Sequence, residues 1–159
     1  MIPLTVRRAV PSDIDGINKL LREVLEIHAA LRPDIFITGT KKYTDGQLEE
    51  IIHSDKTPVF AAVDDTGELL GYCFCELLEQ EATPCSRAMK TLYIDDLCVD
   101  ENARGAHIGR RLYEYALDFA REQGCHSVTL HVWEGNDSAR AFYEKMGMGV
   151  RKTMMETVL

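Results

Sequence analysis

The chain has 159 residues, a length that suits one domain with a sizeable core. Hydrophobic residues make up 45% and charged residues 28%, as in ordinary globular proteins, and no apolar run approaches the roughly 20 residues of a membrane span. The formal net charge of −8 argues against nucleic acid as a partner and suits a cationic ligand. Since the N-terminus lacks the apolar stretch of a signal peptide, we expect a cytoplasmic protein without a membrane partner.

The cysteines and histidines suggest neither disulfides nor a metal site. Five cysteines are an odd number, and no two of them form a C-x-x-C pair. The five histidines show no metal-ligand spacing, so we expect no bound metal.

Strands and helices alternate along the chain. The predicted elements are a strand (4–10), a helix from 11 to about 31, an irregular loop (34–43), a shorter helix (45–53), two strands joined by an Asp-Asp-Thr-Gly turn (58–63 and 69–78), a central strand (91–99), a helix (108–123), a strand (127–133), a helix (136 to about 146) and a last strand (150–158). Because the two kinds of element do not segregate, we predict a mixed α/β class, a single domain over residues 1–159 and one central sheet.

The stretch from 91 to 123 predicts an anion site. A strand with two adjacent carboxylates, Asp95 and Asp96, leads into a loop that contains glycine and then into an amphipathic helix. Free backbone N–H groups and the positive end of the helix dipole make such a helix N-terminus a natural phosphate site. The loop lacks the Lys-Ser/Thr ending of a P-loop and the three spaced glycines of a dinucleotide-binding loop.

Two motifs carry a resemblance to a known family. The loop reads RGAHIG over residues 104–109 and resembles the pyrophosphate loop of the GCN5-related N-acetyltransferases (GNAT), Arg/Gln-x-x-Gly-x-Gly/Ala, with His107 in place of its first signature glycine. The last helix reads NDSARAFYEKMG over residues 136–147 and fills every position of the family's Asn-x-x-Ala-x-x-Phe-Tyr-x-x-x-Gly signature. The resemblance implies a central mixed, mostly antiparallel sheet flanked by about four helices, with acetyl-coenzyme A (acetyl-CoA) as co-substrate. Among family members the chain most resembles diamine and polyamine acetyltransferases.

The resemblance implies three catalytic residues. An alkylammonium with a pKa of about 10.4 costs roughly 4.6 kcal/mol to deprotonate at pH 7, so a carboxylate base is needed during attack on the thioester. Asp95 is the first choice for this base and Asp96 the alternate. In a regular strand they point to opposite faces, whereas a β-bulge would change that. Tyr143 is the expected acid for the leaving thiolate.

The same resemblance assigns the cofactor-binding residues. The backbone of Leu97, Cys98 and Val99 would line the pantetheine arm, and an N–H near Leu97 or Cys98 would meet the oxyanion. The pyrophosphate would lie on Arg104, Gly105, Ala106, His107, Ile108, Gly109 and Arg110, with Asn136 and Tyr143 on the far side. Cys98 is interpreted as an inert buried thiol in preference to a covalent nucleophile. If the loop needs a positive φ at His107, its Cβ costs roughly 1–2 kcal/mol.

The acceptor, a small-molecule amine or a lysine-bearing substrate, is expected to contact the first two helices and their loop. His28, Asp34, Phe36 and Tyr43 are the candidate selectors, with Asp34 as a possible amine anchor. His131 and Trp133 share a face of their predicted strand, where core packing is favoured over a place in the cleft. Two alternatives remain open: a non-catalytic acyl-CoA-binding regulatory module, and a transferase for a larger acyl group. A homodimer is a possible assembly.

Overall fold

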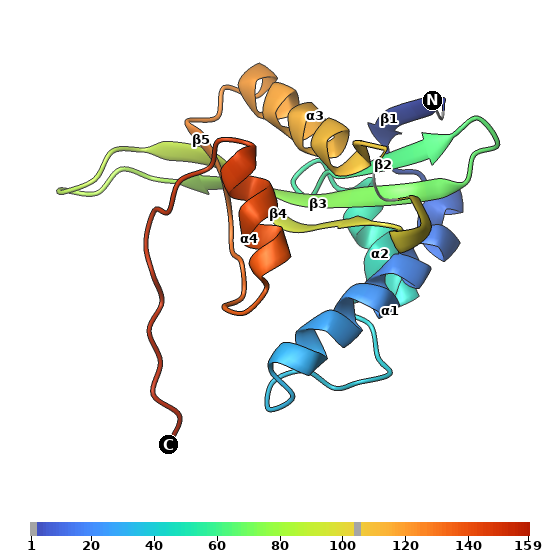
Figure 1. The fold of residues 1–159 in the computed structure, drawn as a ribbon. Coiled ribbons are helices and arrows are strands. Elements are labelled where there is room, and N and C mark those ends of the chain that lie inside the picture. The colour runs from blue at the N-terminus through green and yellow to red at the C-terminus, as the bar shows by residue number, and fades with distance from the viewer. Residues whose placement is uncertain (1–2, 104–105) are drawn as a thin grey trace.

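A five-stranded sheet in the order β1-β2-β3-β4-β5 forms the centre of the fold (Figure 1). The computed structural model describes residues 3–103 and 106–159. The strands are β1 (Leu4–Arg8), β2 (Val59–Asp64), β3 (Leu69–Gln80), β4 (Met89–Val99) and β5 (Ser127–Leu130). The first four strands pair antiparallel in sequence order, and β5 pairs parallel to β4. The predicted central, mixed and mostly antiparallel sheet is therefore confirmed.

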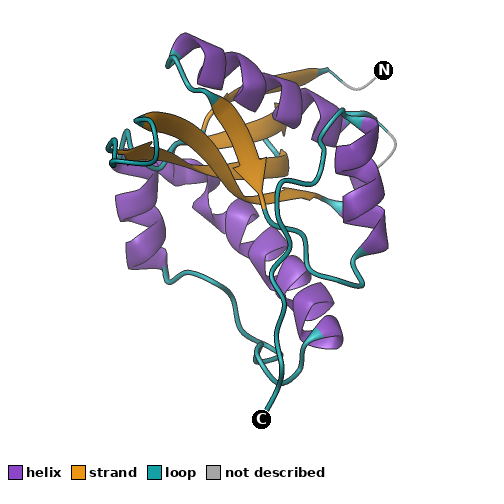
Figure 2. Cartoon of the chain, turned by 90° about the vertical axis from the view of Figure 1, so that its left-hand side faces the viewer, coloured by secondary structure: helices purple, strands orange, loops and turns teal. Residues whose placement is uncertain are grey.

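Helices cover both faces of this sheet (Figures 1 and 2). They are α1 (Ile14–Leu31), α2 (Asp45–His53), α3 (Ile108–Glu122) and α4 (Asp137–Lys145), with short 3-10 turns η1 (Pro11–Asp13) and η2 (Glu101–Ala103). The apolar faces of α1 and α2 pack on one side of the sheet around Tyr72 and Phe74. The apolar face of α3 packs on the other side around Phe60 and Leu92. No helix within residues 3–103 and 106–159 is long and apolar enough to cross a membrane.

A β-bulge interrupts the pairing of β3 with β4. Phe74 pairs with Asp96 but Cys75 pairs with Ile94, so Asp95 is the extra residue on β4. Ile94 and Leu97 both pack into the core beneath α3. The two carboxylates between them lie on the opposite side, where Asp95 contacts Tyr43 and Asp96 contacts Tyr72. The bulge thus places both carboxylates on one face, as regular alternation would not.

Two sequence predictions near the C-terminus are wrong. Strand β5 ends at Leu130 instead of residue 133, because its parallel pairing with β4 stops there. The predicted strand over 150–158 is absent: this segment is extended and fully exposed, with Val150 at 68% and Met154 at 90% exposure. Its apolar pattern suits a strand, but no described strand of the same chain pairs with it. Figure 1 shows this tail leaving α4 and running away from the sheet.

Candidate active site

The candidate site lies where β4 and β5 separate. The parallel register runs from Thr91 opposite Ser127 to Ile94 opposite Leu130 and then stops. Beyond this point β4 continues to Val99 paired only with β3, while the chain after Leu130 turns away toward α4. From Asp95 onward one edge of β4 is therefore open, and its backbone groups are available to an extended ligand.

The N-terminus of α3 lies after this open edge. His107 caps the helix in a left-handed conformation with φ 59° and ψ 24°, and it is the one non-glycine residue with a positive φ within residues 3–103 and 106–159. Its exposed side chain makes no capping hydrogen bond. Since the first intrahelical bond runs from Arg111 N to His107 O (3.0 Å), the amides of 108–110 point out of the helix. Arg104 and Gly105 lie outside the described residues.

Gly109 of α3 lies where this helix meets α4 and the end of β4. A Cβ at this position would lie 3.3 Å from Cζ of Phe142 on α4 and 3.6 Å from Cγ2 of Val99 on β4. The first contact is tighter than ordinary van der Waals packing, so glycine lets α3 approach α4 closely. The signature glycine of the loop therefore lies close to Phe142 of the last helix.

Tyr143 and Asn136 come from α4. Tyr143 is partly buried, 6.2 Å from Tyr113 between ring centroids, and its hydroxyl has no hydrogen-bond partner among the described residues. Desolvation by burial raises the pKa of Tyr143, and the nearby Cys73 and Asp96 raise it further. The phenol is therefore protonated at neutral pH and can donate a proton. Asn136 is the N-cap residue of α4, and its Oδ1 accepts a 3.4 Å hydrogen bond from Ser138 Oγ.

Asp96 is a carboxylate with a raised pKa. Its Oδ2 accepts a 2.6 Å hydrogen bond from the hydroxyl of Tyr72, a residue with no exposed surface. Desolvation by burial raises the pKa of Asp96 to about 6, although the Tyr72 hydrogen bond opposes the shift. A carboxylate that titrates near neutral pH is suited to accept a proton there.

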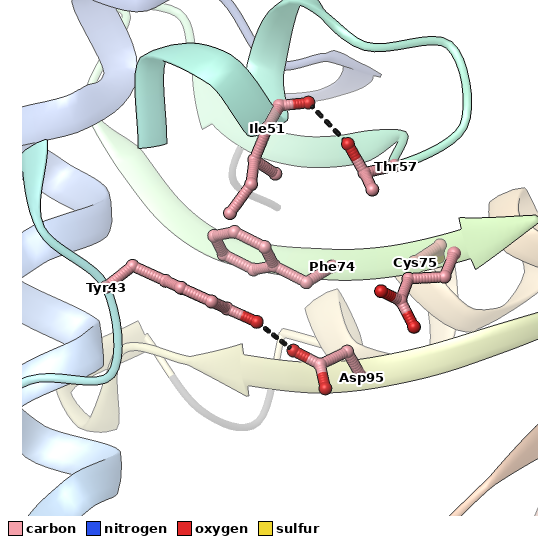
Figure 3. A pocket seen from close by; sticks show the side chains of 7 residues that line it. Tyr43, Ile51, Thr57, Phe74, Cys75 and Asp95 are labelled. Carbon is pink, nitrogen blue, oxygen red and sulfur yellow. Dashed lines mark hydrogen bonds between the residues drawn. The ribbon is translucent and has the colours of Figure 1, made fainter. Parts of the chain in front are cut away.

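Asp95 lines a small cavity on the side of α2 (Figure 3). The cavity has a volume of about 110 Å³ and is lined by Tyr43, Ile51, Thr57, Phe74, Cys75, Glu76 and Asp95. Tyr43 donates a 2.6 Å hydrogen bond to Asp95 Oδ2, and Lys42 Nζ lies 2.8 Å from the same oxygen. Burial, followed by the hydrogen bond to Asp95, raises the pKa of Tyr43. Since Asp95 and Glu76 both line this cavity, it suits a cation.

His28, Phe36 and Trp133 form an aromatic cluster. The ring centroids of His28 and Phe36 lie 5.3 Å apart, and Phe36 makes an edge contact with Trp133 at the same distance. Burial lowers the pKa of His28, and the charge of Lys42 lowers it further. Of the four predicted selectors, Tyr43 contacts Asp95 and Lys42, His28 feels the charge of Lys42, and Phe36 packs on His28.

The structure differs from the sequence interpretation at other positions. Asp34 is exposed and pairs with the Arg32 guanidinium at 2.7 Å, and its role as an amine anchor stays a prediction. Trp133 and His131 are exposed after the end of β5 and do not pack in the core; His131 Nδ1 lies 2.9 Å from the hydroxyl of Tyr93. Lys42 and Glu76 were missed, because nothing in their local sequence marks a site.

Cys98 is buried on the side of α1, with its Sγ 4.0 Å from the carbonyl oxygen of Leu20. Its surroundings are those of a packed thiol. In the described parts of the chain, no group of three or more His, Cys, Asp or Glu residues could hold a metal ion.

Comparison with known proteins supports the assignment of the chain to the GNAT family directly. The model of the acetyltransferase (GNAT) family matches residues 21–148. Glucosamine 6-phosphate N-acetyltransferase of Arabidopsis thaliana is 33% identical over 123 residues, covering 75% of this chain and 78% of the relative. Streptothricin acetyltransferase of Streptomyces lavendulae is 36% identical over 135 residues, covering 85% of this chain and 65% of that relative.

A solved structure agrees over nearly the whole chain. The tetramutant of the BH1408 protein from Bacillus halodurans superposes with a TM-score of 0.93 at 30% identity, covering 98% of this chain and 99% of that one. None of these similarities bears on the diamine resemblance, which stays a prediction. The family match over most of the sequence and the matching fold together show that the chain belongs to the GNAT family and is an N-acetyltransferase.

Proposed function

We propose that the chain transfers an acetyl group directly from acetyl-CoA to the primary amine of a cationic small molecule or of a lysine. One observation carries this proposal. Two carboxylates lie on the same face of β4 at the start of its open edge, and the hydroxyl of Tyr143 nearby has no partner among the described residues.

Acetyl-CoA is the co-substrate of the family, and three features of the site fit it. The amides of 108–110 point out of the N-terminus of α3, where they can hold a pyrophosphate. The open edge of β4 at 97–99 can bond the amide groups of the pantetheine arm. In this proposal, Asn136 and Tyr143 flank the arm from α4.

The proposed chemistry uses the two carboxylates and the tyrosine. Asp95 binds the acceptor ammonium and takes its proton as the amine attacks, with Asp96 as the alternate base whose pKa of about 6 suits that role. A backbone N–H near Leu97 or Cys98 stabilises the oxyanion. Tyr143, held protonated by its raised pKa, gives a proton to the leaving sulfur.

The charge around the amine site points to a cationic acceptor. Asp95 and Glu76 line one small cavity, and the formal net charge of −8 also favours the approach of cations. The two relatives are named for an amino sugar phosphate and for streptothricin, which are small molecules. We place this activity in the cytoplasm, in keeping with the sequence expectation.

The test is the release of coenzyme A thiol from acetyl-CoA across a panel of amines: diamines, amino sugars and lysine peptides. Turnover with a cationic primary amine is expected. The regulatory-module alternative, which the missing glycine at His107 motivates, predicts binding without thiol release. A faster rate with succinyl- or propionyl-CoA would support the larger-acyl alternative. Activity that survives Asp95→Asn and Tyr143→Phe together would refute the assigned roles but not the enzyme class.

We also propose that two copies associate through the C-terminal tail. The tail exposes Val150, Met154 and Met155, and β5 stands at an edge of the sheet with one side unpaired among the described strands. An extended segment of a second copy can add to such an edge. Light scattering should show a dimer for the full chain and a monomer after removal of 150–159; the same mass for both chains would refute this assembly.

A further inference from the structure

A primary amine of the chain itself, that of Lys42, lies on Asp95, where the acceptor amine is proposed to bind. Lys42 Nζ lies 2.9 Å from Oδ1 and 2.8 Å from Oδ2 of Asp95, so it contacts both oxygens of the proposed base. The Lys42 side chain is 45% exposed, whereas that of Asp95 is 18% exposed. The ammonium therefore reaches in from a solvent-accessible position and meets a mostly covered carboxylate.

The loop that carries Lys42 is held in place on both sides. The carboxylate of Glu26 accepts hydrogen bonds from the Thr38 hydroxyl and the Gly39 amide (2.6 Å). After Lys42, the hydroxyl of Tyr43 bonds to Asp95, and Thr44 caps α2 by accepting from Gln47 N. Lys42 Nζ also lies 5.4 Å from the centre of the Tyr43 ring. These contacts fix the loop backbone on both sides of Lys42 and hold its side chain next to Asp95.

This arrangement meets the geometric requirement for an acceptor. An amine and its base must lie within hydrogen-bond reach, about 2.6–3.2 Å, before the proton can move. Asp95 is also the first residue past the end of the β4–β5 ladder, at the start of the open edge proposed to receive the pantetheine arm. An amine on Asp95 therefore stands at the inner end of the proposed thioester site.

From this geometry we propose that Lys42 is a self-acetylation site, an inference that rests on the proposed acetyl-CoA-dependent function. Lys42 Nζ gives one proton to Asp95, which passes it to solvent, and forms a bond to the thioester carbonyl carbon. The C–S bond breaks with its electron pair on sulfur, and the second amine proton ends on that thiolate. The products are acetyl-Lys42 and free coenzyme A, and the ion pair with Asp95 is lost.

Lys41 is an internal control with a less exposed side chain, 16% against 45% for Lys42, so the effect of Asp95→Asn on Lys42 is the deciding comparison. Lys41 is the neighbouring lysine of the same loop, and its Nζ also pairs with a carboxylate, that of Asp45 at 2.5 Å. Its other contact is with Asn18 Oδ1 at 2.7 Å, so it lies away from Asp95 and the open edge of β4. Non-enzymatic acetylation does not require Asp95, whereas self-acetylation modifies Lys42 alone and depends on that residue.

The experiment incubates the purified full chain with acetyl-CoA and follows the acetylation of each lysine by peptide mass spectrometry. Lys42 is expected to be acetylated at least about a hundredfold faster than Lys41, with Asp95→Asn lowering the Lys42 rate by a similar factor. The rate should be independent of protein concentration, because the amine and the base belong to one chain. Lys41→Arg should leave acetylation of Lys42 unchanged, and Lys42→Arg should abolish it.

Three results would overturn the proposal: an unmodified Lys42, equal modification of Lys41 and Lys42, or acetylation of Lys42 that Asp95→Asn leaves unchanged. The amine panel, run on Lys42→Arg, separates this failure from failure of the proposed function. Thiol release with added amines but no acetyl-Lys42 in the wild-type chain refutes self-acetylation alone. Absence of both refutes the proposed function as well.

Discussion

The substitution Asp96→Asn should stabilise the fold at neutral pH. Burial raises the pKa of Asp96 from 3.8 to about 6, so the folded chain holds this proton more tightly than the unfolded chain. Between about pH 4 and pH 6 the folded state binds more protons, and stability from this group therefore falls as the pH rises through that window. Above about pH 6 the full cost of the ionised carboxylate is present.

The size of this cost follows from the shift. About two pKa units at 1.36 kcal/mol each correspond to about 3 kcal/mol. This is an upper limit on the stability gained by Asp96→Asn, because burying the asparagine amide also costs free energy. Asparagine keeps an acceptor for the 2.6 Å hydrogen bond from Tyr72. We expect Asp96→Asn to raise the free energy of unfolding by about 1–3 kcal/mol at about pH 7.5, with the gain fading toward about pH 4.

Urea unfolding of wild type and variant at these two pH values measures the effect. Asp95→Asn is the matched control, because it removes the adjacent carboxylate of the same bulge. That carboxylate is paired with the half-exposed Lys42, so its loss should lower stability by up to about 1 kcal/mol. If Asp96→Asn gave no gain near neutral pH, or the same gain at both pH values, the assignment of a desolvated carboxylate would be refuted.

Three further predictions concern the site. Tyr143→Phe should lower kcat by about a hundredfold while leaving KM for acetyl-CoA nearly unchanged, as the steady-state rate of thiol release would show; an unchanged kcat would remove Tyr143 as the acid. His107→Gly should raise the free energy of unfolding by about 1 kcal/mol, because glycine adopts φ 59° without a Cβ penalty, and should bind coenzyme A equally or more tightly by calorimetry. A tenfold loss of affinity would instead show that the imidazole is a ligand. Trp133→Ala, which removes the edge contact with Phe36, should raise the KM of the amine acceptor about three- to tenfold, and an unchanged KM would place the acceptor elsewhere.

Local motifs in the sequence indicate the loop and the last helix of the candidate site, but not the backbone geometry within them. The family's glycine at the position of His107 raises the question of a positive φ without answering it, and the structure answers it with φ 59°. Regular strand alternation could not show that Asp95 and Asp96 share a face, because a bulge depends on the pairing of two strands.

Long-range contacts and assembly were harder to predict. Lys42 meets Asp95 across 53 residues of sequence, from a loop without periodicity. The apolar pattern of 150–158 predicts a strand, but pattern alone does not supply a partner strand within the chain. The strand pattern favours Trp133 in the core, whereas the end of β5 at Leu130 leaves it exposed.

A crystal structure of the chain with bound acetyl-CoA tests the central claim most directly. We predict that the pyrophosphate lies on the backbone amides of 106–110, that the pantetheine arm runs along 97–99, and that the thioester carbonyl ends beside Asp95 and Tyr143. A cofactor bound elsewhere, with the amides of 108–110 and the open edge of β4 untouched, would contradict the account.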